Sequence, residues 1–432
     1  MFDLVRGGEL RAVLHSGDFR RLYATRLISQ LSDGVFQVAL AGYVFFSPAQ
    51  QTSPAKAAVA FAVLLLPYSI VGPFAGVFID RWSRQRILVW SPLVRAVLVG
   101  AVAASLTRIA ALYGAALLVL GVNRFFLSAL SAALPHVVAR RELVTANALA
   151  VTSGTIIAFA GAGVGYLLRQ IFGPDQDGTA TILVCSAAAY LGASALAMTM
   201  GRDRLGPERP DPIRLSEALG EVVRGLADGA RYIWRQRRTA RALAAISAHR
   251  FLYGIVLIMA GLLYRNYFTT NPQAGLAGLA FFLLVSGAGF FAGAVATPWA
   301  VRKIGKDIWI SLLLGLGALT VATTLTPFRQ FSFLIGGFLL GVVSQGVKVS
   351  VDTIVQESVD DAYRGRVFSV YDMLFNATFV GAAAVAAIAL PTDGKSYGVL
   401  AFLTAAYILT ALAYSARSSS RTGSSSAARP SW

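Results

Sequence analysis

Apolar runs of about 20 residues recur along nearly the whole chain, and they constrain its fold more than any other feature. Such a run suits a helix that crosses a bilayer, because the backbone polar groups must be satisfied within the segment itself. A membrane β-barrel would show alternating segments of about 10 residues instead. The sequence therefore predicts an all-α membrane protein. Its twelve expected spans are 22–46, 56–79, 87–107, 109–134, 144–171, 177–201, 240–265, 274–301, 308–326, 330–355, 364–390 and 395–416.

Charged residues are scarce, and their positions indicate the orientation in the membrane. Only 14% of the residues are charged, against about 25% in soluble proteins, although the net charge is +17. Lys and Arg gather in alternate loops, which marks the cytoplasmic side by the positive-inside rule. We therefore predict a multi-pass protein of the cell membrane with both termini in the cytoplasm. The same pattern explains the basic charge without nucleic acid as a partner.

A long polar segment, 202–239, divides the expected spans into two sets of six. The predicted organisation is a first six-helix bundle (1–201), this cytoplasmic linker, a second six-helix bundle (240–416) and a disordered cytoplasmic tail (417–432). Apolar residues recur in the linker at steps of three and four, while its arginines lie on other faces. This spacing predicts an amphipathic helix that contacts membrane lipids and is anchored by Trp234.

Polar residues inside the first span repeat on one helical face. Arg26, Gln30, Asp33 and Gln37 follow steps of four, three and four residues. Ionisable groups are costly in the hydrocarbon, so they usually face a bundle interior or a cavity. We interpret this face as the lining of a cavity in which Asp33 binds a proton or attracts a cation. The alternative is a charge pair that only holds helices together.

Other spans carry ionisable residues that either line the cavity or form charge pairs that only hold helices together. Arg124 in the fourth span needs a carboxylate or a substrate anion, and Asp33 is its candidate partner if the two spans face each other. Lys348 and Asp352 in the tenth span are four residues apart and can pair within the helix. Asp372 in the eleventh span completes the expected proton and substrate cavity. The pattern assigns no role to Arg95, His249 or Arg250.

Catalytic and metal chemistry is not indicated by the sequence. The chain has three His and a single Cys, Cys185, within an apolar run. These residues form no metal-binding pattern, and no nucleophile is spaced with a base. We therefore expect neither an enzyme nor a cofactor.

The turn after the second span resembles the signature loop of the major facilitator superfamily. The pattern is Gly, three residues, Asp-Arg, two residues and Arg, carried here by Gly76, Asp80, Arg81 and Arg84. The twelve spans and the central linker match this family as well. The resemblance implies two six-helix bundles and a cytoplasmic gate at this turn, in which Asp80 and the arginines hold the cytoplasmic side closed.

Narrower resemblances concern transport chemistry. Arg124 resembles the basic residue in the fourth span of proton-coupled members. The segments 29–34 and 363–369 are similar to the macrolide-efflux and enterobactin-exporter type of the superfamily. The fifth-span segment 161–165 lacks the proline that antiporters of the family carry there.

The loop between the eighth and ninth spans corresponds to the signature loop in the second half. Arg302, Lys303 and Lys306 keep its basic charge, but the position of the acid is taken by Arg302. We therefore expect the two loops to differ, with Asp80→Asn slowing transport more than any single change in the second loop.

These features predict a proton-coupled exporter of a small amphipathic drug-like or siderophore-like compound. It would work by alternating access as a monomer, with protons and the small molecule as its partners. One alternative is an importer or a lysophospholipid-type flipping transporter of the same fold. An alternative of another class is a membrane receptor or scaffold without transport, whose interior would lack buried charge.

Overall fold

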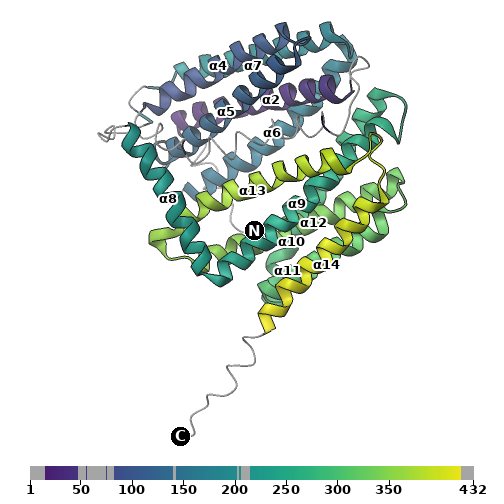
Figure 1. Cartoon of the computed structure of the whole chain (residues 1–432). Coiled ribbons are helices and arrows are strands. Elements are labelled where there is room, and N and C mark those ends of the chain that lie inside the picture. The colour runs from purple at the N-terminus through teal and green to yellow at the C-terminus, as the bar shows by residue number, and fades with distance from the viewer. Residues whose placement is uncertain are drawn as a thin grey trace. The chain divides into compact units, whose positions relative to one another are not determined.

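The computed structural model describes residues 15–46, 55, 74, 82–139, 143–201, 204–205 and 215–419. Within these residues the chain forms twelve α-helices and no strand (Figure 1). The helices before the linker are α2 (Gly17–Phe46), α4 (Arg84–Ala104), α5 (Ile109–Ala133), α6 (Leu143–Phe172) and α7 (Gln176–Met198). The linker helix is α8 (Leu215–Arg235). The later helices are α9 (Arg237–Asn266), α10 (Pro272–Ile304), α11 (Lys306–Thr320), α12 (Gln330–Ser358), α13 (Asp361–Ala389) and α14 (Tyr397–Ser419).

The helix positions agree closely with the predicted spans. In the described part of the chain, ten helices are long and apolar enough to cross a membrane, and they coincide with the third to twelfth predicted spans. The first predicted span is α2, whereas the second, 56–79, lies outside the described residues except for Phe74, which is helical. The all-α membrane architecture is therefore confirmed. The start of the tail differs from the prediction, because α14 remains helical to Ser419.

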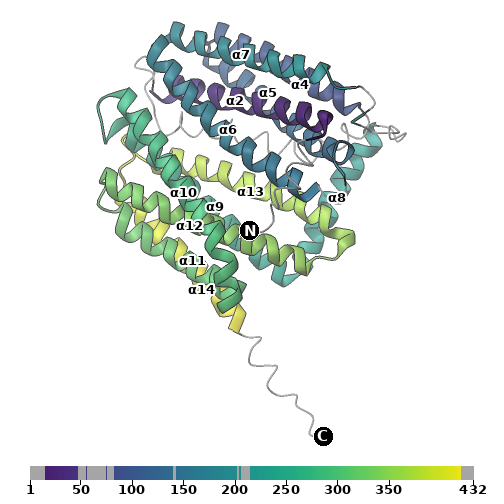
Figure 2. The same ribbon diagram turned by 180° about the vertical axis from the view of Figure 1, so that it is seen from behind.

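The chain forms two compact units, which divide within α8 between Arg224 and Gly225. In unit 1, α2 packs on α6, and α4 packs on α5 and α7. In unit 2, α9 packs on α13, and α11 packs on α12 and α14. Counted within each set of six spans, both units therefore pair the first span with the fifth, and the third span with the fourth and the sixth. The pairs α4–α7 and α11–α14 lie side by side in both views (Figures 1 and 2). The packing therefore reveals the internal repeat expected of the two halves.

Glycines allow two helix pairs to approach closely. A Cβ on Gly34 of α2 would clash with Ala158 O and lie 2.6 Å from Ala162 N of α6. In unit 2, a Cβ on Gly293 of α10 would lie 2.6 Å from Val342 O of α12. These contacts leave no space for a side chain, so the backbones themselves form the interface.

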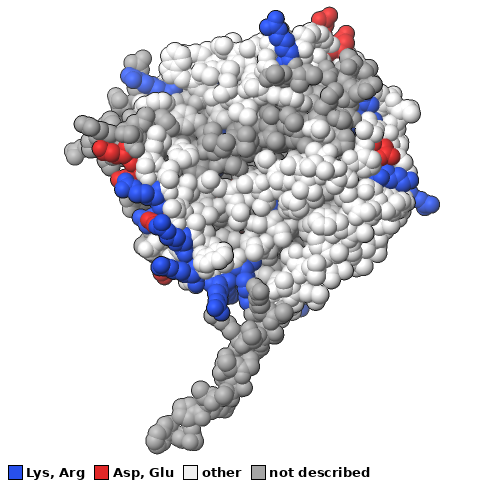
Figure 3. Space-filling model, in the orientation of Figure 1, with Lys and Arg blue, Asp and Glu red and all other residues white. Residues whose placement is uncertain are grey.

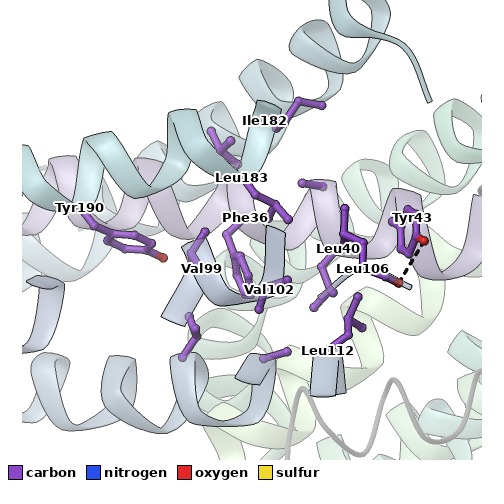
Figure 4. Close-up of a cluster of buried hydrophobic side chains, with 14 of the residues drawn as sticks. Phe36, Leu40, Tyr43, Val99, Val102, Leu106, Leu112, Ile182, Leu183 and Tyr190 are labelled. Atoms are coloured by element: carbon purple, nitrogen blue, oxygen red, sulfur yellow. Dashed lines mark hydrogen bonds between the residues drawn. The ribbon is translucent and has the colours of Figure 1, made fainter. Parts of the chain in front are cut away.

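The interior of unit 1 is layered along the helices. One apolar cluster contains Phe19, Leu88 and Phe126, and a second contains Phe36, Val99 and Tyr190. Figure 4 shows the second cluster, in which Tyr43 Oη donates a hydrogen bond to Leu106 O at 3.1 Å. Polar residues of α2, α4 and α5 lie between the two clusters in the sequence of each helix. A buried polar layer thus separates two apolar layers.

The second half of the linker helix α8 is attached to the junction of α12 and α13. The ring of Tyr232 stacks on Tyr363 with centroids 4.7 Å apart, and its hydroxyl donates to Asp360 Oδ2 at 3.1 Å. Gln236 Nε2 donates to Ser358 O at 3.1 Å. Basic side chains gather along α8 (Figure 3), and Trp234 is 87% exposed. The helix in the linker was predicted, and its lipid contact stays a prediction.

Candidate functional site

A carboxylate and a guanidinium meet in the polar layer of unit 1. Arg95 Nη1 donates to Asp33 Oδ1 at 2.8 Å, and the two side chains are 0% and 7% exposed. Tyr190 Oη donates to the same carboxylate oxygen at 2.5 Å. Three helices, α2, α4 and α7, therefore meet at one atom of Asp33.

The guanidinium of Arg95 has further partners around it. Its Nη1 also donates to Asn123 Oδ1 at 2.9 Å, and its Nη2 donates to Ser29 Oγ. Its central carbon lies 4.8 Å from the ring centroid of Phe126 and 4.4 Å from that of Tyr190. These contacts offset part of the cost of removing the cation from water. We call the hydrogen-bonded residues the polar network of unit 1: Ser29, Asp33, Arg95, Asn123 and Tyr190.

A change in the charge state of Asp33 would alter this network. An ionised carboxylate accepts hydrogen bonds and neutralises Arg95, while a protonated one loses the ion pair. Removing one partner of a buried ion pair costs about 3–5 kcal/mol, because the other charge remains without compensation. Proton binding at Asp33 would therefore favour a different arrangement of α2, α4 and α7.

The partner predicted for Asp33 was wrong. Arg95, rather than Arg124, forms the ion pair. The reason is helical geometry: Asn123 faces the polar network, and the next residue on α5 points about 100° away. Arg95 could have been found, since it is the one charged residue within the predicted span 87–107. Tyr190 gave no comparable signal, because an isolated tyrosine in an apolar span is common.

The four polar residues predicted on one face of the first span have different surroundings in the structure. Arg26 Nε donates to Gln30 Oε1 at 3.1 Å, and both side chains lie against Gly154 of α6. Asp33 is buried among α4 and α7, while Gln37 is exposed. The four residues therefore do not line one enclosed cavity within unit 1.

The predicted pair in unit 2 is present. Lys348 Nζ donates to Asp352 Oδ2 at 2.6 Å, and the two side chains are 38% and 28% exposed. The ammonium also lies 5.9 Å from the ring centroids of Tyr371 and Phe375. Asp372 lies on the exposed side of α13, where its backbone carbonyl accepts from Asn376 Nδ2 at 2.8 Å. Lys348 and Asp352 are thus paired on α12, whereas Asp372 lies on the neighbouring segment α13 and is not part of that pair.

His249 lies at the centre of a second buried network, in unit 2. Its Nδ1 is 3.1 Å from Tyr407 Oη, and its ring stacks on Tyr253 with centroids 5.9 Å apart. Tyr253 Oη is 2.8 Å from Ser286 Oγ. This network joins α9, α10 and α14 through neutral hydrogen-bonding groups.

Arg250, the next residue, faces a different helix. Its guanidinium carbon lies 3.9 Å from the ring centroid of Phe375 and 4.6 Å from that of Phe379, both on α13. In the described part of the chain, the side chain forms no ion pair with an acid, and its Nε is buried without a hydrogen-bond partner.

Of the predicted cytoplasmic gate, only Arg84 belongs to the described residues. Gly76, Asp80 and Arg81 lie outside them. Arg84 begins α4, and its Nη1 donates to Ala132 O at 2.9 Å and to Leu205 O at 3.2 Å. These bonds fix the start of α4 against the end of α5 within unit 1.

An acid follows the loop between α10 and α11, and its contacts were not predicted from the sequence. Asp307 lies in the first turn of α11, directly after Lys306. Its carboxylate accepts from Tyr414 Oη at 2.8 Å and lies 3.6 Å from Arg238 Nη2 and 3.8 Å from Arg241 Nη2. Asp307 does not occupy the position that corresponds to Asp80, so the expected difference between the two loops stays a prediction.

Comparisons with known proteins agree with this architecture. The model of the Major Facilitator Superfamily matches residues 22–384. An uncharacterized MFS-type transporter of Mycobacterium tuberculosis is 37% identical, over 92% of this chain and 90% of its own length. The multidrug efflux pump Tap of the same organism is 27% identical, over 82% of this chain and 83% of its own. Macrolide efflux protein A of Streptococcus pyogenes is 22% identical, over 81% and 84%.

Solved structures show the same fold. The nucleoside transporter NupG superposes with a TM-score of 0.66 at 13% sequence identity, and the match covers 92% of this chain and 98% of that one. At this identity the likeness concerns the fold alone. The predicted family resemblance, including its macrolide-efflux branch, is confirmed by these matches.

Proposed function

Because this chain belongs to the major facilitator superfamily, we propose that it is a proton-coupled exporter of a small amphipathic drug-like or siderophore-like compound. It is a multi-pass membrane transporter of small molecules, and its relatives are transporters rather than enzymes. Transporters of this fold work by alternating access, in which two bundles move about a central site. We place the protein in the cell membrane as a monomer with both termini in the cytoplasm.

The polar network of unit 1 is the observation that carries the proton coupling. Asp33 joins three helices through one buried oxygen, so a change in its charge alters the contacts between them. An exporter needs such an element, because proton binding must favour one arrangement of the helices over another. Asp33 is the proposed proton carrier, and Arg95 replaces Arg124 as the residue that sets its proton affinity.

The direction of transport rests on the relatives. Two of them are named efflux proteins, and they match more than four fifths of this chain at 27% and 22% identity. We extend that direction to this chain as part of the proposal. The signature loop with Gly76, Asp80, Arg81 and Arg84 would then hold the cytoplasmic side closed during release.

A proteoliposome assay with an imposed pH gradient tests the proposal. The panel consists of lipophilic cations, macrolides and siderophores, with the movement of each compound measured in both directions. Asp33→Asn should abolish gradient-driven efflux while the protein remains folded and inserted. The matched control is Asp177→Asn, which removes an exposed carboxylate at the start of α7. Unchanged gradient-driven efflux in Asp33→Asn would remove Asp33 from the mechanism.

A further inference from the structure

Arg250 is a membrane-embedded cation without an acidic partner among the described residues. It lies on α9, whose full length from Arg237 to Asn266 is long and apolar enough to span the membrane. Its guanidinium rests on the rings of Phe375 and Phe379, which lie four residues apart on one face of α13. The residue is only partly buried, although its Nε is enclosed.

Two aromatic rings do not satisfy a guanidinium. The group carries five N–H donors in one plane, and ring faces compensate its charge without accepting hydrogen bonds in that plane. A cation at this depth is costly and is normally paired. The planar donors suit a carboxylate, sulfonate or phosphate, which can accept two parallel hydrogen bonds.

The surrounding charges leave Arg250 uncompensated. Lys348, which lies 5.9 Å from the same Phe375 ring, is neutralised by Asp352 at 2.6 Å. Neighbouring His249 is engaged with Tyr407 and contributes no negative charge. Two carboxylates, Asp352 and Asp372, also lie near this face of α13, but Asp352 is paired with Lys348, and Arg250 forms no ion pair with either of them.

Unit 1 provides an independent parallel. Arg26 of α2 forms no ion pair with an acid in the described residues, and its Nε donates to the neutral Gln30. The acid of that unit, Asp33, is already occupied by Arg95 and Tyr190. Each unit, considered by itself, thus offers a cation rather than a free carboxylate.

We propose that Arg250, together with the rings of Phe375 and Phe379, binds the anionic group of an amphipathic cargo. The inference rests on the proposed transport function and specifies its substrate class: an organic anion with an apolar or aromatic body. The guanidinium binds the acid group, and the rings contact the adjoining apolar part of the molecule. At this subsite, cationic amphiphiles should bind more weakly than anions with the same apolar body.

Equilibrium binding in detergent, without any pH gradient, tests the subsite separately from transport. The probes are sulforhodamine B, a net anion, and rhodamine B ethyl ester, a net cation with the same xanthene body. Binding is followed by fluorescence anisotropy with the full-length protein. Wild type should bind the anion about tenfold to a hundredfold more tightly than the cation, as expected for charge-assisted hydrogen bonds.

Three variants define the role of Arg250. Arg250→Gln should lose this preference, and Arg250→Lys should retain part of it. The matched control is Lys303→Gln, which removes an exposed cation that lies 4.3 Å from the ring centroid of Trp299 on α10. This control should bind like wild type. Thermal unfolding in the same detergent establishes that each variant is folded, and the Arg250→Lys variant keeps the test informative if Arg250→Gln is unstable.

Equal affinity of wild type for the two dyes, or an unchanged preference in folded Arg250→Gln, would overturn the proposal. A lipid headgroup is the other source of the same chemistry, so binding is repeated with added phosphatidylglycerol. Retained dye binding supports a cargo site, whereas displacement assigns Arg250 to lipid and overturns the cargo assignment. Failure of gradient-driven efflux with intact anion preference would contradict the proton-coupled function and leave this subsite standing.

Discussion

Both units join an ionisable residue of their first helix to a tyrosine of their last helix, but they treat charge differently. In unit 1, Tyr190 donates to Asp33, which is paired with Arg95. In unit 2, Tyr407 contacts the neutral ring of His249, and the cation next to it, Arg250, lies on aromatic rings. At this place in the repeat, unit 1 thus holds a buried ion pair, and unit 2 holds a cation that has no acidic partner among the described residues.

This difference suggests a division of roles. A buried ion pair responds to proton binding by its acid or to removal of either partner, because its energy depends on both charges. A cation that has no acidic partner can bind an anion from outside the protein without first breaking an internal ion pair. Our proposals therefore place proton coupling in unit 1 and recognition of the cargo's anionic group in unit 2.

Breaking the pair in unit 1 should have the largest effect. Arg95→Leu leaves the Asp33 carboxylate buried and unpaired, so we expect a loss of about 3–5 kcal/mol in the free energy of unfolding. The double variant Asp33→Asn with Arg95→Leu should recover much of that loss, because no uncompensated charge remains. Unfolding in detergent measures both. Similar stabilities for Arg95→Leu and wild type would show that the pair is not sealed from water.

Removing the two tyrosine hydroxyls compares the units directly. Tyr190→Phe deletes a hydrogen bond to a charged acceptor, which we expect to cost about 1.5–3 kcal/mol. Tyr407→Phe deletes one to a neutral ring, at an expected cost of about 0.5–1.5 kcal/mol. Unfolding in detergent measures the loss of stability in each of the two variants. A larger effect at Tyr407 would reverse the assignment of the charged network to unit 1.

Glycine substitutions test whether close helix packing is shared by the units. Gly161→Ala in α6 places a methyl group against Leu31 O, and we expect a loss of about 1–3 kcal/mol from overpacking. Gly163→Ala, two residues away, meets no atom within 4 Å and should be nearly neutral. Gly289 and Gly287 of α10 form the corresponding matched pair in unit 2. Equal stabilities within a pair would contradict the packing of that unit.

The smallest effect should come from the loop between α10 and α11. Asp307→Asn weakens two partly exposed ion pairs, so we expect at most about 1 kcal/mol in stability. Its effect on the transport rate should exceed that of Arg302→Gln, since Asp307 contacts both α9 and α14. Equal transport rates in these two variants would show that the acid of this loop has no mechanical role.

The sequence predicted the helices well and the pairing of their side chains poorly. Span length and the alternation of charged loops follow from the bilayer itself, so the ends of α4 to α7 and of α9 to α14 agree with the predicted spans within a few residues. The Lys348–Asp352 pair was also predictable, because both residues share one helix face. The Asp33–Arg95 pair was not, since it depends on which helices are neighbours and how each is rotated. The contacts of Asp307 could not be predicted for a related reason: its partners come from α9 and α14, far away in the sequence.

The most direct test of proton coupling at Asp33 is the proton flux that accompanies transport. Proteoliposomes containing a pH indicator receive a transported compound from the panel, without an imposed gradient, and the internal pH is recorded. For wild type we predict proton movement opposite to that of the compound. For Asp33→Asn we predict none, whereas Asp177→Asn should behave as wild type. Proton movement of equal size in Asp33→Asn and wild type would contradict the account.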